Sequence, residues 1–485
     1  MVLVLVTLLA VNCTRNSTPV AKSSPTPSLG ALVWTDCSGG FQCATLQVPL
    51  DYAHTELGTI GIAINRKPAT VPANRIGSLL INPGGPGASG LDFVRGSAAA
   101  LPGLNRRFDL VGFDPRGVGE SAPVRCVDGP HEDALNALDS VLDDPAEKQT
   151  AIQAIKDFTA GCSQNSAKVL PFVDTVSAAK DMDLMRAALG DAKLTYLGFS
   201  YGTFLGETYA HLFPTHVRAL SLDAVLDPSV SANDLLLGQA TAFEQILHTF
   251  LSDCSARKAA SPPCQYARSG DPYTKLVALM QRLDSTPLRV GNRLLTRSLA
   301  MTGVLWRSYY QPTWPILERE LALVDQGDGS LLLASADDYN GRKADGTFNN
   351  ELDANSAINC LDHPAPTDIA AYDALGPAFA KAAPFYGPWM QYSNLTCAYW
   401  PVKPTRQPGL LTADGAPPIL LVGSTGDPAT PYAMAQSVNQ QLAGSVLLTR
   451  QGSGHISYNV SACVRNAEDS YLISLALPPP GTVCI

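Results

Sequence analysis

The sequence lacks several features that would point to common function classes. It has no glycine-rich phosphate loop of the Walker type, no internal repeat, no Cys-x-x-Cys pair and no Cys/His cluster at zinc spacing. We therefore expect no metal site and no cofactor. Runs of basic residues interleaved with aromatic residues are also missing, and the formal net charge is −9. This composition argues against a general nucleic-acid-binding protein.

Long hydrophobic runs are scarce as well. The apolar stretch over residues 2–11 is too short to span a bilayer. Its end, Leu9-Ala-Val-Asn-Cys13, resembles a bacterial lipoprotein signal, in which the cysteine becomes acylated. No Lys or Arg precedes the run, and Asn12 stands where Gly or Ala is expected, so a plain cleaved signal peptide is the alternative. Both interpretations predict export, the first with membrane attachment through an acylated Cys13. The stretch over residues 14–30 is rich in Ser, Thr and Pro, and this composition predicts a disordered tether between the signal segment and the folded protein.

The cysteines support export. Eleven are present, and ten remain when Cys13 is set aside. An even set of this size is typical of an oxidising compartment, although the sequence does not fix the connectivity. Because short loops close at low entropic cost, we predict that neighbours along the chain are joined. The expected disulfides are Cys37–Cys43, Cys126–Cys162, Cys254–Cys264, Cys360–Cys397 and Cys463–Cys484.

One short stretch suggests a catalytic nucleophile. Residues 198–202, Gly-Phe-Ser-Tyr-Gly, form a Gly-x-Ser-x-Gly pattern with Ser200 at its centre. A buried strand is predicted over residues 194–197 and a helix over residues 203–213. Strand, tight turn and helix are the context of a nucleophile elbow, which holds the serine hydroxyl above the edge of a sheet. The alternative is a glycine- and serine-rich turn with no chemistry.

Two later residues complete a catalytic triad in the expected order. A strand predicted over residues 418–423 leads to Asp427, and a strand predicted over residues 445–449 leads to His455. The chain order serine, aspartate, histidine is that of the α/β-hydrolases. His455 would remove the proton from the Ser200 hydroxyl, and Asp427 would fix the imidazole tautomer and stabilise its cation. Asp223, which follows a strand expected over residues 217–222, is the alternative acid of the triad.

A glycine-rich loop predicts the oxyanion hole. A strand expected over residues 75–82 runs into Pro83-Gly-Gly-Pro-Gly-Ala-Ser-Gly90. In α/β-hydrolases the two N–H donors come from this loop and from the residue after the nucleophile. We therefore expect Gly85 and Tyr201 to donate, with a turn kept for geometry alone as the alternative. Further along, Asp114 and Arg116 are predicted to brace the active-site loops by charge-assisted hydrogen bonding.

These features predict an α/β-hydrolase fold with a mostly parallel central sheet and a large, mainly helical inserted cap. Hydrophobic residues make up 46% of the 485 and charged residues 16%, which suits a sizeable core. The expected division is a signal and tether over residues 1–30, the first part of the core over 31–228, the cap over 229–405, and the second part of the core over 406–485. Helices are expected over residues 132–161, 176–189, 232–253, 273–283, 299–310 and 314–325.

Four motifs together resemble the tripeptidyl aminopeptidase-like serine peptidases. The motifs are Asn82-Pro-Gly-Gly-Pro-Gly-Ala-Ser-Gly90, Phe108-Asp-Leu-Val-Gly-Phe-Asp-Pro-Arg-Gly117, Leu194-Thr-Tyr-Leu-Gly-Phe-Ser-Tyr-Gly-Thr203 and Gly426-Asp-Pro-Ala-Thr-Pro431. The family consists of exported bacterial α/β-hydrolases related to proline iminopeptidases, and residues 471–484 look like its C-terminal TAP-type segment. The resemblance implies release of tripeptides from free N-termini through an acyl-enzyme, beneath a cap that blocks endopeptidase access. Proline iminopeptidases carry a histidine where this chain has Pro83.

The sequence suggests three hypotheses for the function of the protein. The first is an exported serine aminopeptidase whose partner is a peptide or protein N-terminus. The second is a cell-envelope esterase or lipase with the same triad, and the third, a non-catalytic envelope protein, is disfavoured by the triad. An aminopeptidase should present carboxylates to the substrate ammonium, whereas a lipase should show an apolar tunnel. The candidate carboxylate is Asp362, in a cap segment at residues 355–363 that resembles a recurring family stretch; the alternative is that it caps a turn or pairs with an arginine.

Overall fold

The computed structural model describes residues 32–260 and 262–485. The predicted signal, the tether and Cys13 therefore lie outside the described residues. Within the described ranges, no helix combines the length and the apolar character needed to cross a membrane.

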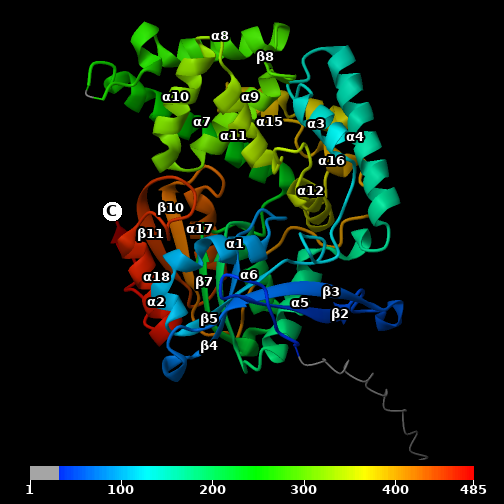
Figure 1. Cartoon of the computed structure of the whole chain (residues 1–485), viewed down its shortest axis with the longest axis vertical. Coiled ribbons are helices and arrows are strands. Elements are labelled where there is room, and N and C mark those ends of the chain that lie inside the picture. The colour runs from blue at the N-terminus through cyan, green and yellow to red at the C-terminus, as the bar shows by residue number, and fades with distance from the viewer. Residues whose placement is uncertain (1–31, 261) are drawn as a thin grey trace, which may run out of the picture.

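A ten-stranded sheet lies in the lower half of the view in Figure 1. Its order is β1-β2-β3-β5-β4-β6-β7-β10-β11-β12, antiparallel from β1 to β5 and parallel in every pair from β5 to β12. This mostly parallel sheet confirms the predicted fold class. The strands are β1 (Thr35–Asp36), β2 (Gln42–Pro49), β3 (Thr59–Lys67), β4 (Gly77–Asn82), β5 (Phe108–Phe113), β6 (Leu194–Phe199), β7 (Val217–Asp223), β10 (Leu420–Gly426), β11 (Val446–Ser453) and β12 (Val483–Cys484).

Helices cover both faces of the sheet, because successive side chains of a strand point to opposite faces. On β4, Leu79 and Ile81 pack with residues of α1 (Gly90–Ser97), α2 (Pro102–Asn105) and α18 (Ala462–Ser474). Leu80 packs on the opposite face with residues of α5 (Thr175–Ala188), α6 (Tyr201–Leu212) and α17 (Tyr432–Gln441). The strands are buried on both sides, as parallel sheets require.

The chain between β7 and β10 forms the cap, which Figure 1 shows beyond one edge of the sheet. Most of its helices share a hydrophobic cluster that includes Phe243, Phe250 and Trp314, whereas α12 packs with the core of the sheet. The four helices predicted here are confirmed as α7 to α10. The elements are α7 (Ala232–Ala256), α8 (Pro272–Ser285), β8 (Leu288–Val290), β9 (Arg293–Leu295), α9 (Arg297–Ser308), α10 (Trp314–Val324), α11 (Ser330–Asn340), α12 (Glu351–Asp362), α13 (Ile369–Asp373), α14 (Gly376–Ala382), α15 (Gly387–Met390) and α16 (Leu395–Ala398).

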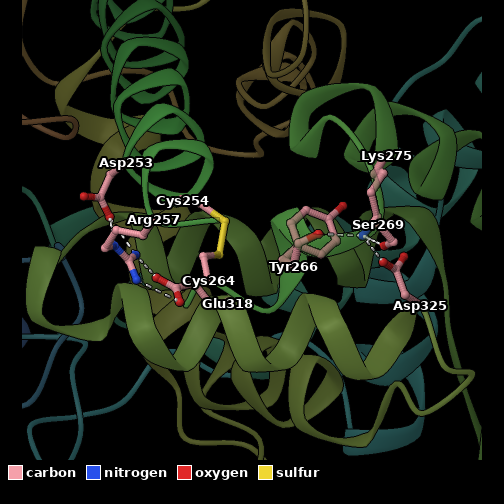
Figure 2. The surroundings of a disulfide bond; sticks show 9 residues. All are labelled: Asp253, Cys254, Arg257, Cys264, Tyr266, Ser269, Lys275, Glu318 and Asp325. Carbon is pink, nitrogen blue, oxygen red and sulfur yellow. Dashed lines mark hydrogen bonds and ion pairs between the residues drawn. A yellow bond between two sulfur atoms is a disulfide. The ribbon is translucent and has the colours of Figure 1, made fainter. Parts of the chain in front are cut away.

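The five predicted disulfides are all present, each between the expected partners. Figure 2 shows the bond Cys254–Cys264, which ties the end of α7 to the following turn. On one side of it Arg257 pairs with Asp253 and with Glu318 of α10. On the other side Lys275 of α8 pairs with Asp325, at 2.5 Å, just beyond α10. Covalent and ionic links thus hold α7, α8 and α10 together at the outer end of the cap.

The single helix predicted over residues 132–161 is wrong. The structure has two helices there, α3 (Gly129–Ala137) and α4 (Pro145–Ser166). Pro145 occupies the first turn of α4, and the Asp144 side chain caps that turn by accepting from the N–H groups of Ala146 and Glu147. Proline is favoured at the first helical position and disfavoured inside a helix, so the chain starts a new helix at this point.

Arg116 is the largest fully buried side chain and does not pair with Asp114. Its guanidinium donates to both carboxylate oxygens of Asp181 on α5, at 2.6 and 2.7 Å, and to three backbone carbonyls. Asp114 instead accepts from the Ser89 hydroxyl at 2.7 Å and from two backbone N–H groups. Asp114 therefore braces the end of the glycine-rich loop, and Arg116 joins that part of the core to α5.

Replacing Arg116 should be far more costly than replacing an exposed arginine. Arg116→Met leaves the Asp181 carboxylate buried without its charge partner, so we expect a loss of roughly 3–5 kcal/mol in the free energy of unfolding. Arg95→Met is the matched control, because Arg95 pairs with an exposed aspartate, Asp92, and should cost less than about 1 kcal/mol. Urea unfolding followed by circular dichroism measures both, and similar losses in the two variants would contradict the assignment.

Candidate active site

Ser200 stands on a strained turn between a strand and a helix. β6 ends at Phe199, α6 begins at Tyr201, and Ser200 between them has φ 55° and ψ −126°. A positive φ is uncommon for a residue with a side chain and persists only where the surroundings enforce it. Here the Ser200 N–H donates to the Asp223 carbonyl at the end of β7, at 3.0 Å. The strand, turn and helix predicted from the sequence are present.

Glycines let two backbone segments approach the turn. A Cβ on Gly84 would lie 2.5 Å from the Phe199 carbonyl oxygen and 2.9 Å from Ser200 Cβ. A Cβ on Gly198 would lie 2.5 Å from the Gly202 carbonyl oxygen. Because the obstructing atoms belong mostly to backbone, they have no rotamer that would relieve the clash. The glycine-rich loop after β4 therefore packs directly against the nucleophile turn.

The sheet brings the three triad residues to one edge. β6, β7, β10 and β11 are neighbours and run parallel, so their carboxyl ends lie at the same edge, where Ser200, Asp427 and His455 follow β6, β10 and β11. His455 Nδ1 lies 2.9 Å from each oxygen of the buried Asp427 carboxylate. This contact holds the proton on Nδ1 and leaves Nε2 as the basic nitrogen.

Asp223, the alternative acid, contacts a different partner. Its carboxylate accepts from the N–H groups of Ser457 and Tyr458, at 2.8 Å each. Burial raises the pKa of Asp223 to about 6, against the lowering effect of these two hydrogen bonds. Asp223 therefore anchors the segment that follows His455, whereas Asp427 contacts the imidazole itself.

Two further residues contact the imidazole, and the sequence analysis missed both. The Thr430 hydroxyl donates to Asp427 at 3.1 Å and lies 3.5 Å from His455 Nδ1. In the cap, the carbonyl of Tyr309 accepts from the His455 N–H at 2.7 Å, and the two rings meet edge to face with centroids 5.6 Å apart. The histidine is thus positioned by the core and by the cap together.

A cavity of about 290 Å³ lies between Ser200 and the cap. Its core side is lined by Ser200, Gly85, Pro86 and Tyr201. The backbone N–H groups of Gly85 and Tyr201 donate to no other group among the described residues. Two free N–H donors beside a serine are the arrangement that can stabilise an oxyanion formed when the hydroxyl attacks a carbonyl carbon.

The cap side of the cavity is polar without being charged. It carries four amide side chains, Gln239, Asn355, Asn359 and Asn394, among aliphatic and aromatic residues. His363 also lines it, and burial lowers the pKa of this imidazole to about 4, so it is neutral at physiological pH. None of the described residues that line the cavity is a carboxylate. The sequence analysis did not identify the amides, although the 355–363 segment holds two of them one helical turn apart.

The proposed role of Asp362 in binding the substrate ammonium is wrong. Asp362 is 1% exposed and does not line the cavity. Its carboxylate accepts from both the N–H, at 3.1 Å, and the hydroxyl of Thr175, at the positive end of α5. The same hydroxyl lies 2.5 Å from the Tyr201 hydroxyl. Asp362 is therefore engaged below the nucleophile turn, with no oxygen free for a substrate.

An acidic cluster elsewhere resembles a metal site only in composition. Asp139, Glu147 and Asp284 offer ligand atoms within 4.8 Å of one another. Arg297 pairs with both Asp139 and Asp284, so the cluster already has a cationic partner. None of these residues lines the cavity at Ser200.

Comparisons with known proteins find several relatives of this chain. Residues 383–484 match a family described as TAP-like protein. The chain is 38% identical to "Serine protease Hip1" of Mycobacterium tuberculosis, over 99% of this chain and 96% of that protein. It is 37% identical to "Carboxylesterase B" of Mycobacterium tuberculosis, over 91% and 86% respectively. It is also 34% identical to "Tripeptidyl aminopeptidase" of Streptomyces lividans, over 91% and 84%.

Asp362→Asn should gain stability relative to the wild type as the pH rises. Burial raises the folded-state pKa of Asp362 from 3.8 to about 7. The folded protein thus holds a proton that the unfolded chain releases, and the wild type loses stability as the pH rises from about 4 to about 7. Asparagine does not titrate, so between about pH 4 and pH 8 the stability of the variant should rise by on the order of 4 kcal/mol relative to that of the wild type.

Thermal unfolding between about pH 4 and pH 8 measures this difference, with the exposed Asp157→Asn as the control. The control should follow the wild-type curve. If Asp362→Asn loses stability with rising pH as steeply as the wild type, the Asp362 carboxyl does not titrate in this range.

Proposed function

Because the chain belongs to the TAP-like family of serine hydrolases with the α/β-hydrolase fold, we propose that it is an exported aminopeptidase. It would release short peptides, tripeptides above all, from free N-termini. The relatives named serine protease and tripeptidyl aminopeptidase support a peptide substrate.

The proposed reaction uses Ser200 as nucleophile. His455 Nε2 takes the proton from the hydroxyl as the oxygen attacks the carbonyl carbon, and Asp427 stabilises the resulting imidazolium. The N–H groups of Gly85 and Tyr201 bind the oxyanion of the tetrahedral intermediate. The C–N bond then breaks, the leaving amine takes the proton from His455, and an ester remains on Ser200. Water then attacks the ester while His455 takes its proton, the acyl C–O bond breaks, and the proton passes from His455 to the Ser200 oxygen as the short peptide leaves.

The cavity beneath the cap is the observation that best supports release of short peptides from the end of a chain. Cap residues such as Leu236, Phe243 and Trp389 line it together with Ser200. A cavity of about 290 Å³ can take a few residues of a chain end, whereas the middle of a longer polypeptide would have to leave it on both sides. A cavity of this limited size beneath a cap favours an exopeptidase over an endopeptidase.

A second candidate function is an esterase, and one observation favours it. Because no carboxylate lines the described cavity, the substrate ammonium lacks the charged partner expected of an aminopeptidase. The relative named carboxylesterase is consistent with ester substrates. The amide side chains, however, give the cavity a polar wall that an apolar acyl tunnel would not have.

The two functions differ in how they treat the substrate N-terminus. We expect a tripeptide p-nitroanilide with a free N-terminus to be hydrolysed at least about tenfold faster, in kcat/KM, than its N-acetylated counterpart. Ser200→Ala gives the background rate for both substrates. Equal rates on the two peptides, or hydrolysis of p-nitrophenyl esters without hydrolysis of either peptide, would favour the esterase and refute the aminopeptidase.

Export is proposed on chemical grounds. Five disulfides within one chain require an oxidising compartment to form and persist. Membrane attachment would depend on acylation of Cys13. Expressed in an actinobacterial host fed with labelled palmitate, the wild type should incorporate label and Cys13→Ser should not. Incorporation of label by both proteins would contradict acylation at Cys13. Recovery of the reduced protein from the cytosol would contradict export.

A further inference from the structure

We propose that amide oxygens, in place of a carboxylate, bind the α-ammonium group of the substrate in the cap cavity. The oxygens belong to Gln239 on α7, Asn359 on α12 and Asn394 at the start of α16. This inference rests on the proposed aminopeptidase function, and it identifies the part of the site that would distinguish a free N-terminus.

Hydrogen bonds within the protein engage the nitrogen of each amide and leave its oxygen as the available acceptor. Gln239 Nε2 donates to the Ala429 carbonyl at 2.9 Å, and Asn394 Nδ2 donates to the Ala232 carbonyl at 3.0 Å. A carbonyl oxygen can only accept, so neither amide can be turned round without losing a bond.

Asn359 is oriented by a chain of amides. The Asn355 Nδ2 donates to the Pro86 carbonyl, in the loop that carries Gly85, at 2.9 Å. Its oxygen must therefore accept from Asn359 Nδ2, also at 2.9 Å. The amide nitrogens of all three cavity residues are thus engaged, and their oxygens accept from no described residue.

The three residues line the same cavity, and the elements that carry them are linked through the protein. On α7, the residues that line the cavity share one helical face, and they are Ala232, Leu235, Leu236, Gln239 and Phe243. Asn394 is bonded to the first residue of that face. The disulfide between Cys360 and Cys397 joins α12, next to Asn359, to α16, which Asn394 begins. Covalent and hydrogen-bond links therefore connect all three elements.

Uncharged hydrogen-bond acceptors, such as these amide oxygens, are suited to an ammonium group. An ammonium has three N–H donors and no acceptor, so three carbonyl-type oxygens can satisfy it. Hydrogen bonds from a charged donor are stronger than those between neutral groups, which offsets part of the cost of removing the ammonium from water. Nearby aromatic rings, including Trp389 and Phe243, are further partners for a cation.

Glu351 is the carboxylate that competes with this assignment. It begins α12 and lies near Tyr309 and Tyr339, which line the cavity; burial raises the pKa of both hydroxyls, and the Glu351 carboxylate raises it further. Its side chain does not line the cavity, and burial raises its own pKa, which disfavours the charged form. A test of the amides must therefore include Glu351.

The experiment compares two substrates that differ only at the ammonium. One is a tripeptide p-nitroanilide beginning with alanine, and the other is its des-amino analogue, which begins with a propionyl group and is no larger. The quantity measured is the ratio of the two kcat/KM values, because a general distortion of the site lowers both alike. Asn359→Leu and Gln239→Met should each reduce this ratio roughly 10- to 100-fold, the effect of removing one acceptor from a charged donor. Gln245→Leu, on the exposed face of α7, is the matched control and should leave the ratio unchanged.

Each result has a distinct meaning. If the wild type does not prefer the free-amine substrate, the aminopeptidase function fails and the inference fails with it. If the wild type shows the preference and both amide variants retain it, the function stands and the inference is refuted. If Glu351→Gln removes the preference and the amide variants keep it, the ammonium is bound by that carboxylate. Circular dichroism and thermal unfolding of each variant separate loss of binding from loss of fold.

Discussion

The left-handed turn at Ser200 is the constraint to which much of the surrounding structure is adapted. Holding a non-glycine residue at φ 55° costs on the order of 1–3 kcal/mol, so neighbouring groups must fix it. Gly84 and Gly198 let backbone approach the turn, and the Asp223 carbonyl binds the Ser200 N–H. On the far side, the hydroxyl of Tyr201 meets Thr175, which Asp362 binds in turn. Residues that never reach a substrate thus help to place the nucleophile.

The cap is hydrogen-bonded to three of the loops around the candidate active site. The Tyr309 carbonyl binds the His455 N–H, Asn355 binds the oxyanion loop at Pro86, and Gln239 binds Ala429 in the acid loop. Asn350 adds three bonds to the segment after β5, including one that it accepts from the Gly119 N–H. A displacement of the cap would therefore disturb catalytic geometry as well as access to the cavity.

Patterns that depend on neighbouring residues in the chain were predictable from the sequence. The nucleophile turn, the order Ser200, Asp427, His455 and the local disulfides belong to this group, because strand ends and short loops fix them. The break between α3 and α4 was also signalled, by Asp144 and Pro145, and was overlooked. Roles that depend on which way a side chain faces could not be predicted. Asp362 and Asn359 stand three positions apart on α12, yet only Asn359 lines the cavity, because α5 attracts the carboxylate.

The central claim is that catalysis proceeds through a peptidyl ester on Ser200, and trapping that ester tests it most directly. The enzyme would be mixed with an activated ester of a free-amine tripeptide, quenched in acid within milliseconds, digested and mapped by mass spectrometry. The account predicts the added mass of the tripeptidyl group on the peptide that contains Ser200. An adduct on another residue would contradict this mechanism. It would also be contradicted if the substrate were consumed and no adduct appeared at any quench time, under conditions in which acylation is faster than hydrolysis of the ester.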